Sequence, residues 1–367
     1  MSIISKILLA LLVVVVLAVA SLAIAVSHNS ACGPSPTAAV AQPVKAAVYR
    51  CYGSADVVRI ETIAKPVPGP HGLLVRIHAS SINPLDWHFM RGEPYLIRPM
   101  SGWGAPKDIL LGTDFAGTVE AVGALVTRFK PGDEVFGGGD GAFGEYLRIP
   151  DTGAVALKPA GVTFEQAAAV PVAGITALQA LRDVGQLRPG QKVLINGAGG
   201  GVGTFAVQIA KALGGDVTAV TNTGSVDLVR SLGADHVIDY TQQDFTQGTV
   251  KYDLIFDLSG TQPLSAYRRV LTPTGTYVPG GNTDKGKWLG PILGFGKTLI
   301  VAKFANQKLV PVSANLSAAD LTVLADLMQS GKLKPVIDRR YPLDRVADAI
   351  RYQETFHARG KVVVTVE

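Results

Sequence analysis

A run of glycines in the middle of the chain has the composition of a phosphate-binding loop. Five of the seven residues from Gly197 to Gly203 are glycine. The run lies between a short apolar segment, Val193–Ile195, and a segment with helical spacing of apolar residues, Phe205–Leu213. A strand that turns through glycines into a helix directs backbone N–H groups and the positive end of the helix dipole at one point. Side chains would block a pyrophosphate there, so the sequence predicts a dinucleotide site.

Two glycine spacings fit this loop, and neither is the commonest one. Gly197-x-x-Gly200-x-x-Gly203 and Ala198-x-x-Gly201-x-Gly203 are both present, whereas the commonest NAD fingerprint is G-x-G-x-x-G. A tight turn without a ligand is the alternative, but the flanking strand and helix supply the context that the motif requires. The expected cofactor contacts in the loop are Gly197, Ala198, Gly199, Gly200, Gly201, Val202 and Gly203.

The strand expected after the loop, Val217–Thr221, bears on the choice of cofactor. In NAD-binding proteins an acid about 20 residues beyond the glycines holds the ribose. Residues 221–225 contain no carboxylate, and the expected contacts there are Thr221, Asn222 and Thr223. A hydroxyl-rich pocket without an acid tolerates a 2′-phosphate. We therefore expect NADP(H) rather than NAD, although no Arg or Lys lies nearby.

Two patterns of secondary structure are expected to position these residues. Short strands separated by turn residues from Lys45 to Ile149 predict a partly closed β-barrel. From Thr163, where Thr163–Gln166 has the form of a capping box, strands and helices alternate and predict a doubly wound parallel sheet. The strands at 334–341 and 361–366 are expected to rejoin the barrel. We assign residues 45–167 and 317–367 to the barrel domain and 168–316 to the nucleotide domain.

The C-terminal ends of the parallel strands supply further candidates, because ligands bind at that edge of an open α/β sheet. The residues that follow two such strands are Ser259, Gly280, Gly281 and Asn282. We expect them to contact the cofactor through their backbone.

The N-terminal segment, residues 1–27, contains an uncharged run from Ile7 to Val26. At about 1.5 Å per residue it is long enough to cross a bilayer. We expect an uncleaved membrane anchor, followed by a linker at residues 28–44. The alternatives are a signal peptide cleaved after Ala23-Ile24-Ala25 and a lipid anchor on Cys32.

Two arguments about the side of the membrane oppose each other. Lys6 precedes the span and no Lys or Arg follows until Lys45, which favours a body outside the cytoplasm. A cofactor supplied inside the cell favours a cytoplasmic body. Because the charge bias is a single lysine, we expect a cytoplasmic body, with export after signal cleavage as the alternative.

Composition excludes several other classes of protein. Charged residues are 17% and hydrophobic residues 47% of the chain, which argues against disorder. The net charge of +5 is too small and too dispersed for a nucleic-acid partner. The two cysteines, Cys32 and Cys51, cannot build a disulfide framework, and the six histidines lack ligand spacing, so no metal site is expected.

The body from Lys45 onward resembles the medium-chain dehydrogenase/reductase superfamily, and within it the zinc-independent quinone oxidoreductase branch that includes zeta-crystallin. The resemblance implies a GroES-like barrel domain and a Rossmann domain. Besides the glycine run, the matching segments are Ser81–Trp87, Leu111–Gly117, Phe129–Phe136, Gly141–Tyr146, Val170–Leu178, Leu232–Tyr240 and His357–Lys361.

The departures from the zinc alcohol dehydrogenases of that superfamily suggest the reaction. Asn83 and Thr113–Asp114 stand where those enzymes carry a Cys and a His-Glu pair, and the four-cysteine lobe is absent from the sequence. Without a zinc-bound alkoxide, oxidation of a simple alcohol lacks its activating step. We therefore expect hydride transfer from NADPH to a small electron acceptor, either a quinone or an α,β-unsaturated carbonyl.

The resemblance also implies roles for individual residues. Asn83 would lie beside the nicotinamide and bind its carboxamide or the substrate carbonyl, and Tyr95 is a candidate proton source. Thr176 would contact the nicotinamide ribose, and Tyr240 would join Thr221–Thr223 at the 2′-phosphate. Arg359 and Lys361 would form a C-terminal contact to NADP.

Other functions stay open at this point. A trans-2-enoyl thioester reductase would use the same fold, and a non-catalytic NADPH-binding sensor or structural protein would keep the fold without turnover. A homodimer is also left open. The segment from Lys285 to Lys308 has five lysines, no acid and many apolar residues. It is expected to pack as a helix or lid on the nucleotide domain, with contact to anionic lipid headgroups as the alternative.

Overall fold

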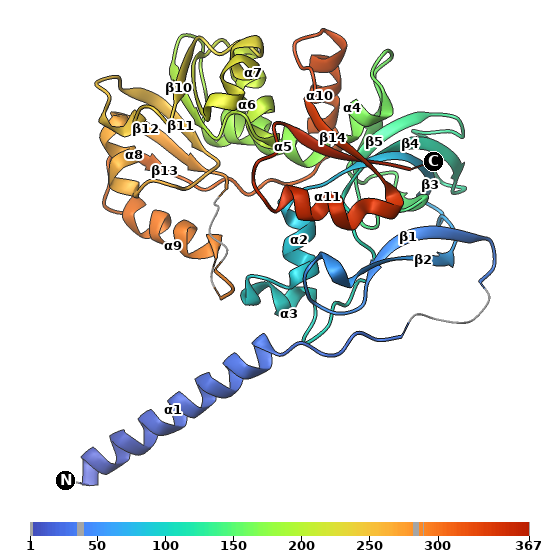
Figure 1. Ribbon diagram of the computed structural model, residues 1–367, viewed down its shortest axis with the longest axis horizontal. Coiled ribbons are helices and arrows are strands. Elements are labelled where there is room, and N and C mark those ends of the chain that lie inside the picture. The colour runs from blue at the N-terminus through green and yellow to red at the C-terminus, as the bar shows by residue number, and fades with distance from the viewer. Residues whose placement is uncertain (1–2, 35–39, 282–285, 289, 367) are drawn as a thin grey trace.

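The computed structural model describes residues 3–34, 40–281, 286–288 and 290–366. Figure 1 shows a body with a barrel-like half and a half built on a parallel sheet, from which a long N-terminal helix projects. The strand pairings confirm the expected fold class, a β-barrel combined with a doubly wound sheet.

The barrel half joins strands from both ends of the body. Its sheet has the order β14-β15-β3-β4-β5-β7, with β6 also paired to β3. The last strand, β15, runs antiparallel to β3 and places Val364 opposite Ser80. A separate ribbon is formed by β1 and β2. The bounds are β1 Pro43–Tyr49, β2 Val58–Ala64, β3 Gly72–Ser81, β4 Asp114–Val122, β5 Glu134–Gly138, β6 Tyr146–Pro150, β7 Val155–Leu157, β14 Ile337–Pro342 and β15 Lys361–Thr365.

Short helices surround this sheet. They include α2 Pro84–Arg91, η2 Tyr95–Ile97, α3 Arg98–Ser101, α4 Phe164–Ala168 and α11 Val346–Gln353. The capping box expected at α4 is confirmed, because Thr163 Oγ1 accepts from the Gln166 N–H at 3.2 Å and Gln166 Oε1 accepts from the Thr163 N–H at 3.0 Å.

The other sheet is parallel throughout, with the order β10-β9-β8-β11-β12-β13. Its strands are β8 Lys192–Asn196, β9 Asp216–Thr221, β10 His236–Asp239, β11 Tyr252–Asp257, β12 Leu271–Pro279 and β13 Lys308–Leu309. Its helices are α5 Pro171–Leu178, which continues as a π-helix over Gln179–Val184, α6 Gly201–Ala212, α7 Val226–Ser231, α8 Leu264–Val270, α9 Pro291–Ala302 and α10 Ala318–Gln329.

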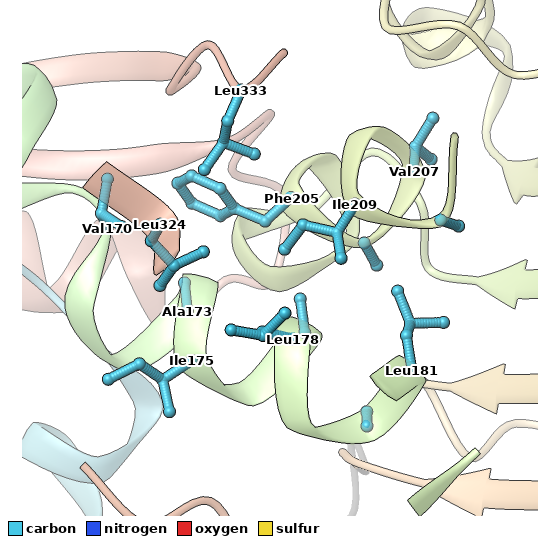
Figure 2. Close-up of a cluster of buried hydrophobic side chains, with 14 of the residues drawn as sticks. Val170, Ala173, Ile175, Leu178, Leu181, Phe205, Val207, Ile209, Leu324 and Leu333 are labelled. Carbon is cyan, nitrogen blue, oxygen red and sulfur yellow. The ribbon is translucent and has the colours of Figure 1, made fainter. Parts of the chain in front are cut away.

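The core between α5, α6 and α10 supports the helix that follows the glycine loop. Figure 2 shows Phe205 and Ile209 of α6 directed toward Leu178 of α5 and Leu324 of α10. These four side chains are at most 2% exposed. Full burial of a side chain of this size stabilises the fold by about 1.5–3 kcal/mol. Apolar packing therefore fixes the position of α6, and with it the glycine loop.

The N-terminal helix α1, Ile3–Ser27, is long and apolar enough to cross a membrane. Most of its described side chains are exposed. A signal segment near the N-terminus would have the same length and composition. A membrane anchor and a cleaved signal are thus both compatible with α1.

The chain just after α1 is bound to the body through a buried arginine. Arg98, the first residue of α3, is fully buried. Its guanidinium donates to the carbonyl oxygens of Val26 and His28, each at 2.9 Å. The Ser30 N–H donates to the Gly104 carbonyl at 2.8 Å. The C-terminal end of α1 is thereby held against the segment that contains η2 and α3.

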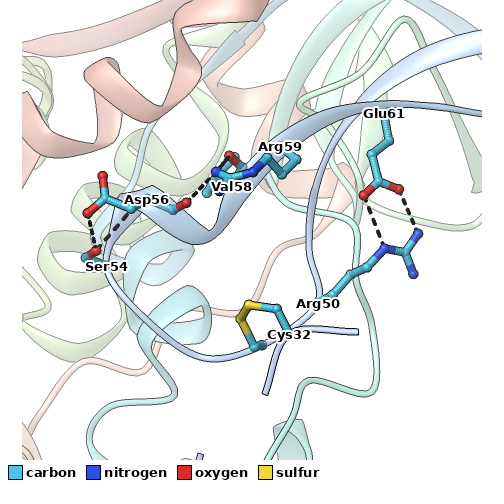
Figure 3. The surroundings of a disulfide bond; sticks show 8 residues. Cys32, Arg50, Ser54, Asp56, Val58, Arg59 and Glu61 are labelled. Atoms are coloured by element: carbon cyan, nitrogen blue, oxygen red, sulfur yellow. Dashed lines mark hydrogen bonds and ion pairs between the residues drawn. A yellow bond between two sulfur atoms is a disulfide. The ribbon is translucent and has the colours of Figure 1, made fainter. Parts of the chain in front are cut away.

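A disulfide adds a second attachment for the same linker. Cys32 and Cys51 are bonded, with their Cα atoms 4.7 Å apart, and the Arg50–Glu61 ion pair at 2.7 Å lies beside them (Figure 3). As expected, two cysteines are too few for a disulfide framework. They nevertheless form one disulfide, which joins the linker to the residues after β1. Disulfides persist in oxidising compartments, so this pair weighs against the expected cytoplasmic body.

We expect replacement of Arg98 by methionine to release the linker. The buried carbonyl of Val26 and the part-buried carbonyl of His28 would both lose their donor, and a buried group left unpaired costs about 1–3 kcal/mol. Arg98→Met should lower the unfolding temperature and open residues 26–34 to limited proteolysis. The control is Arg59→Met, because Arg59 also donates to backbone carbonyls but is exposed. Equal protease resistance of the two variants would contradict this role of Arg98.

Candidate active site

The glycine run forms a tight loop between the end of β8 and the start of α6. Gly197 has a left-handed φ of 87°, and Gly200 is the last residue before the helix. A Cβ atom on Gly203 would lie 2.2 Å from the Gly197 carbonyl oxygen, and one on Gly199 would lie 2.7 Å from Thr221 Oγ1. The loop therefore has no room for side chains at these positions. Its geometry fits the pyrophosphate of a dinucleotide.

A buried carboxylate organises the neighbouring strand ends. Asp257, at the end of β11, is fully buried. It accepts hydrogen bonds from Asn196 Nδ2 at 2.9 Å, the Gly260 N–H at 3.1 Å and the Tyr277 hydroxyl at 2.7 Å. Asn196 Nδ2 also donates to Ser259 Oγ at 2.6 Å. Ser259 thus lies next to the end of β8, at the edge of the sheet expected to bind the cofactor.

A second polar cluster is buried between the barrel half and the glycine loop. Lys361, Asn83 and Asp114 are at most 3% exposed. The Lys361 ammonium donates to Asn83 Oδ1 at 2.5 Å and to the Ile82 carbonyl at 3.1 Å. It also lies 3.4 Å from Asp114 Oδ2, the oxygen that accepts from Asn83 Nδ2 at 2.8 Å. The three side chains therefore form one closed network.

Neighbouring groups complete the coordination of Asp114. The Ser81 hydroxyl donates to Oδ2 at 2.8 Å, and the backbone N–H of Val172 in α5 donates to Oδ1 at 2.9 Å. Burial lowers the pKa of Lys361, while the carboxylates of Asp114 and Asp86 oppose this shift. We conclude that the network holds Lys361 as a paired cation in the interior.

Lys361 also connects this cluster to the glycine loop. A Cβ atom on Gly201 would lie 3.2 Å from Lys361 Cδ. The Gly360 N–H donates to the Gly199 carbonyl at 3.1 Å, in a bridge between the two chain segments. The aliphatic part of Lys361 therefore passes the start of α6, while its ammonium group reaches the barrel half.

Asp86 lies next to this network and has a raised pKa. It is 2% exposed, and it accepts from the Asn83 N–H at 2.7 Å and from the Thr113 hydroxyl at 3.3 Å. Burial raises the pKa of Asp86 to about 7, and the nearby charge of Asp114 adds to the rise. The carboxyl group therefore titrates near neutral pH.

This arrangement bears on the role expected for Asn83. Its amide oxygen accepts from Lys361 and its amide nitrogen donates to Asp114. Both ends of the side chain are thus engaged inside the protein, which favours positioning of Lys361 over direct contact with a ligand. A carboxylate and an amide already bonded to an ammonium group do not fit a zinc ion. Among the described residues, no group of three His, Cys, Asp or Glu side chains is placed to bind a metal.

The adenosine end of the expected cofactor site contains an acid that the sequence analysis missed. Thr221 is buried, and the Tyr240 N–H donates to its carbonyl at 3.0 Å while the Tyr240 side chain is 56% exposed. The Thr223 hydroxyl donates to Asp239 Oδ2 at 2.6 Å. Asp239 comes from β10, and pairing of β10 with β9 places it opposite Thr221. The end of β9 therefore has a carboxylate beside it, although residues 221–225 contain none. Asn222, between Thr221 and Thr223, is half-buried.

Thr176 and Tyr95 also make contacts within the protein. The Thr176 hydroxyl donates to the Val172 carbonyl of its own helix at 2.7 Å. The Tyr95 ring lies over the Arg98 guanidinium at 4.5 Å and edge-on to Trp288 at 5.0 Å. The contacts described for Tyr95 do not link it to the Asn83 network.

The remaining predicted residues lie at the sheet edge and near the last strand. A Cβ atom on Gly280 would lie 2.5 Å from the Phe256 ring, and one on Gly281 would lie 2.5 Å from the Leu258 carbonyl. Asn282 falls outside the described residues. Arg359 is exposed, and its N–H donates to Asp338 at 3.1 Å.

Two family models match the chain. Residues 69–159 match the alcohol dehydrogenase GroES-like domain, and residues 232–364 match the zinc-binding dehydrogenase family. The name zinc-binding dehydrogenase describes the family as a whole. In this chain the polar cluster consists of Lys361, Asn83 and Asp114.

Several similar proteins are named as reductases or oxidoreductases. The 2-methylene-furan-3-one reductase of Solanum lycopersicum is 33% identical over 92% of this chain and 83% of its own length. The chloroplastic NADPH-dependent alkenal/one oxidoreductase of Arabidopsis thaliana is 32% identical, with the same shares. The structure of the quinone oxidoreductase from Coxiella burnetii has a TM-score of 0.78 and 28% identity, and covers 89% of this chain and 100% of its own.

The raised pKa of Asp86 predicts a pH-dependent stability. The folded protein holds the Asp86 proton more tightly than the unfolded chain, where the pKa is near 3.8. Unfolding therefore becomes easier as pH rises from about 4 to 7. We expect wild type to lose stability relative to Asp86→Asn over that interval, with a constant difference above it. Denaturant unfolding at several pH values measures this, and Asp227→Asn controls for loss of an exposed carboxylate. A difference independent of pH would refute the assignment.

The loop sterics predict different effects for two glycines. Gly203→Ala would place Cβ against backbone atoms at 2.2 Å, whereas the nearest atom to a Cβ on Gly200 is 3.5 Å away. We expect Gly203→Ala to weaken NADPH binding at least about tenfold and to lower the unfolding temperature. Gly200→Ala should keep the unfolding temperature of wild type. Calorimetric unfolding and a fluorescence titration with NADPH distinguish the two.

Proposed function

The chain belongs to the medium-chain dehydrogenase/reductase superfamily as a nicotinamide-dependent oxidoreductase, and we propose that it transfers hydride from NADPH to a quinone or an α,β-unsaturated carbonyl. The observation that supports this best is the buried Lys361–Asn83–Asp114 network. Asn83 and Asp114, which the resemblance aligns with zinc ligands of alcohol dehydrogenases, bind the Lys361 ammonium group instead. Reduction of an electron-poor acceptor therefore suits the site better than oxidation of an alcohol.

The proposed division of labour follows from this geometry. When bound, NADPH supplies the hydride. The glycine loop and the start of α6 hold the pyrophosphate, and Ser259, Gly280 and Gly281 line the adjacent sheet edge. Lys361 keeps a fixed positive charge in a dry interior, where it stabilises negative charge that develops on the acceptor oxygen. Asn83 and Asp114 orient that ammonium group. The acceptor takes its proton from Tyr95 or from water.

The preference for NADPH is a separate part of the proposal. The hydroxyl of Thr223 and the exposed ring of Tyr240 suit a phosphorylated ribose, and the Arabidopsis relative is named as NADPH-dependent. Asp239 opposes this preference, because its carboxylate holds the Thr223 hydroxyl. We therefore propose a weaker preference for NADPH over NADH than the residues at the end of β9 alone suggest.

We further propose that α1 holds the enzyme at a membrane. The redox state of Cys32 and Cys51 reports which side of the membrane the body faces, because disulfides persist in oxidising compartments. Lys6 before the span also favours a body on that side, whereas supply of NADPH favours the cytoplasm. Alkylation of the cysteines in intact cells, with and without prior reduction, separates the two.

A screen of NADPH oxidation tests the reaction. We expect turnover with quinones and enones, and Lys361→Met should lower kcat/KM by about 100-fold, the usual scale for loss of an electrostatic donor. Lys332→Met, which removes an exposed lysine, should keep the wild-type value. Tight binding of NADPH without turnover would support the non-catalytic alternative. Turnover only with enoyl thioesters would support the enoyl reductase.

A further inference from the structure

We propose that the face of the body next to the end of α1 rests in the membrane interface, and that the acceptor enters the site from the bilayer. The acceptor would be a lipophilic quinone or enone dissolved in lipid. This inference rests on the proposed reductase function and on α1 as an anchor. Leu96, Met100 and Trp103 define the surface, which we call the anchor-side patch.

The end of α1 is fixed beside this patch. Arg98 lies between Leu96 and Met100 in the chain and holds the carbonyls of Val26 and His28. Figure 1 shows α3 next to the C-terminal end of α1. Since the anchor and the patch are joined by buried hydrogen bonds and not by a loose linker, the patch must lie close to the bilayer when α1 is embedded in it.

The composition of the patch suits an interface with lipid. Met100 is 81% exposed, Trp103 53% and Leu96 51%, all within eight residues. Val67, also on the barrel half, is 77% exposed, but no other large exposed apolar side chain lies within ten residues of it in the chain, and a single exposed apolar residue needs no explanation. Trp favours the boundary between lipid and water. The Lys107 ammonium lies 3.4 Å from the Met100 carbonyl, where it can meet an anionic headgroup.

The nucleotide half contributes to the same side of the molecule. The Tyr95 N–H donates to the Lys287 carbonyl at 2.7 Å, and the Tyr95 ring contacts Trp288, which is 48% exposed. Part of the lysine-rich apolar segment of the sequence, 285–308, is thereby placed next to η2. The outer residues Lys287 and Trp288 extend the patch across both halves.

A cavity opens between these two halves, in contact with α2. It is lined by Trp87, His88, Arg91, Glu93, Pro94, Gly286, Lys287 and Glu354. Among its lining residues, Trp87 is about one turn along α2 from Asn83, and Pro94 directly precedes η2, which begins the segment that carries the anchor-side patch. This cavity is the entry route that we propose for an acceptor leaving the bilayer at the patch.

Photocrosslinking of the full-length protein in lipid vesicles tests the surface directly. Benzoylphenylalanine replaces Met100 in one variant and Val67 in a control, which is 77% exposed. Val67 lies three residues after Ala64, the last residue of β2. This end of the β1–β2 ribbon is opposite to the end that carries the disulfide at Cys51. We expect lipid adducts at position 100 and few at position 67. Equal adducts at the two positions would overturn the proposal, whatever the activity of the enzyme.

Kinetics test the route of the acceptor. The double variant Met100→Glu with Trp103→Glu should lose about tenfold or more of the rate with a long-tailed quinone embedded in vesicles, because charged side chains resist insertion into lipid. It should keep the rate with a tail-less, water-soluble quinone. Val67→Glu with Leu125→Glu is the matched control, since both residues are exposed. An equal loss of rate with both quinones would overturn the bilayer route. If the wild type turned over neither quinone, the reductase function would be refuted, and the lipid crosslinks alone would then test whether the patch contacts the membrane.

Discussion

The ammonium group of Lys361 is the constraint on which the rest of this molecule depends. Taking a cation out of water costs several kcal/mol, and that cost is offset only where acceptors surround it. Asn83, Asp114 and the Ile82 carbonyl provide those acceptors from the barrel half. The aliphatic part of Lys361 meanwhile passes the start of α6. The contact therefore fixes the barrel half against the glycine loop and places a lysine paired with a carboxylate where the two meet.

The cofactor site combines rigid backbone with supporting polar contacts. Gly199 and Gly203 lie too close to other atoms for any side chain, and the packed core of α5, α6 and α10 prevents the loop from shifting. Asp257 ties together the ends of three parallel strands through Asn196 and Tyr277. The dinucleotide would thus meet a preformed surface, which reduces the entropy lost on binding.

The N-terminal region is more than a tether in this structure. Arg98 and the Cys32–Cys51 bridge attach the linker at two points, so the body has a defined position relative to the end of α1. That position gives meaning to Met100 and Trp103, which would otherwise be unexplained exposed side chains. It also opposes two arguments about location, since a disulfide favours an oxidising compartment and the proposed cofactor, NADPH, is supplied in a reducing one.

The amino-acid sequence by itself determined the fold class and many element boundaries, and it singled out the glycine loop that we propose as the dinucleotide site. These properties depend on local periodicity and on glycine, and both can be recognised within a few residues of chain. The strand expected at Val217–Thr221, for example, is observed as β9, Asp216–Thr221. Tertiary structure alone decided which polar groups meet. Lys361 and Asn83 are 278 residues apart, Asp239 reaches Thr223 from a neighbouring strand, and Arg98 reaches the end of α1. Such contacts arise from strand pairing and domain closure, whose partners no local pattern specifies.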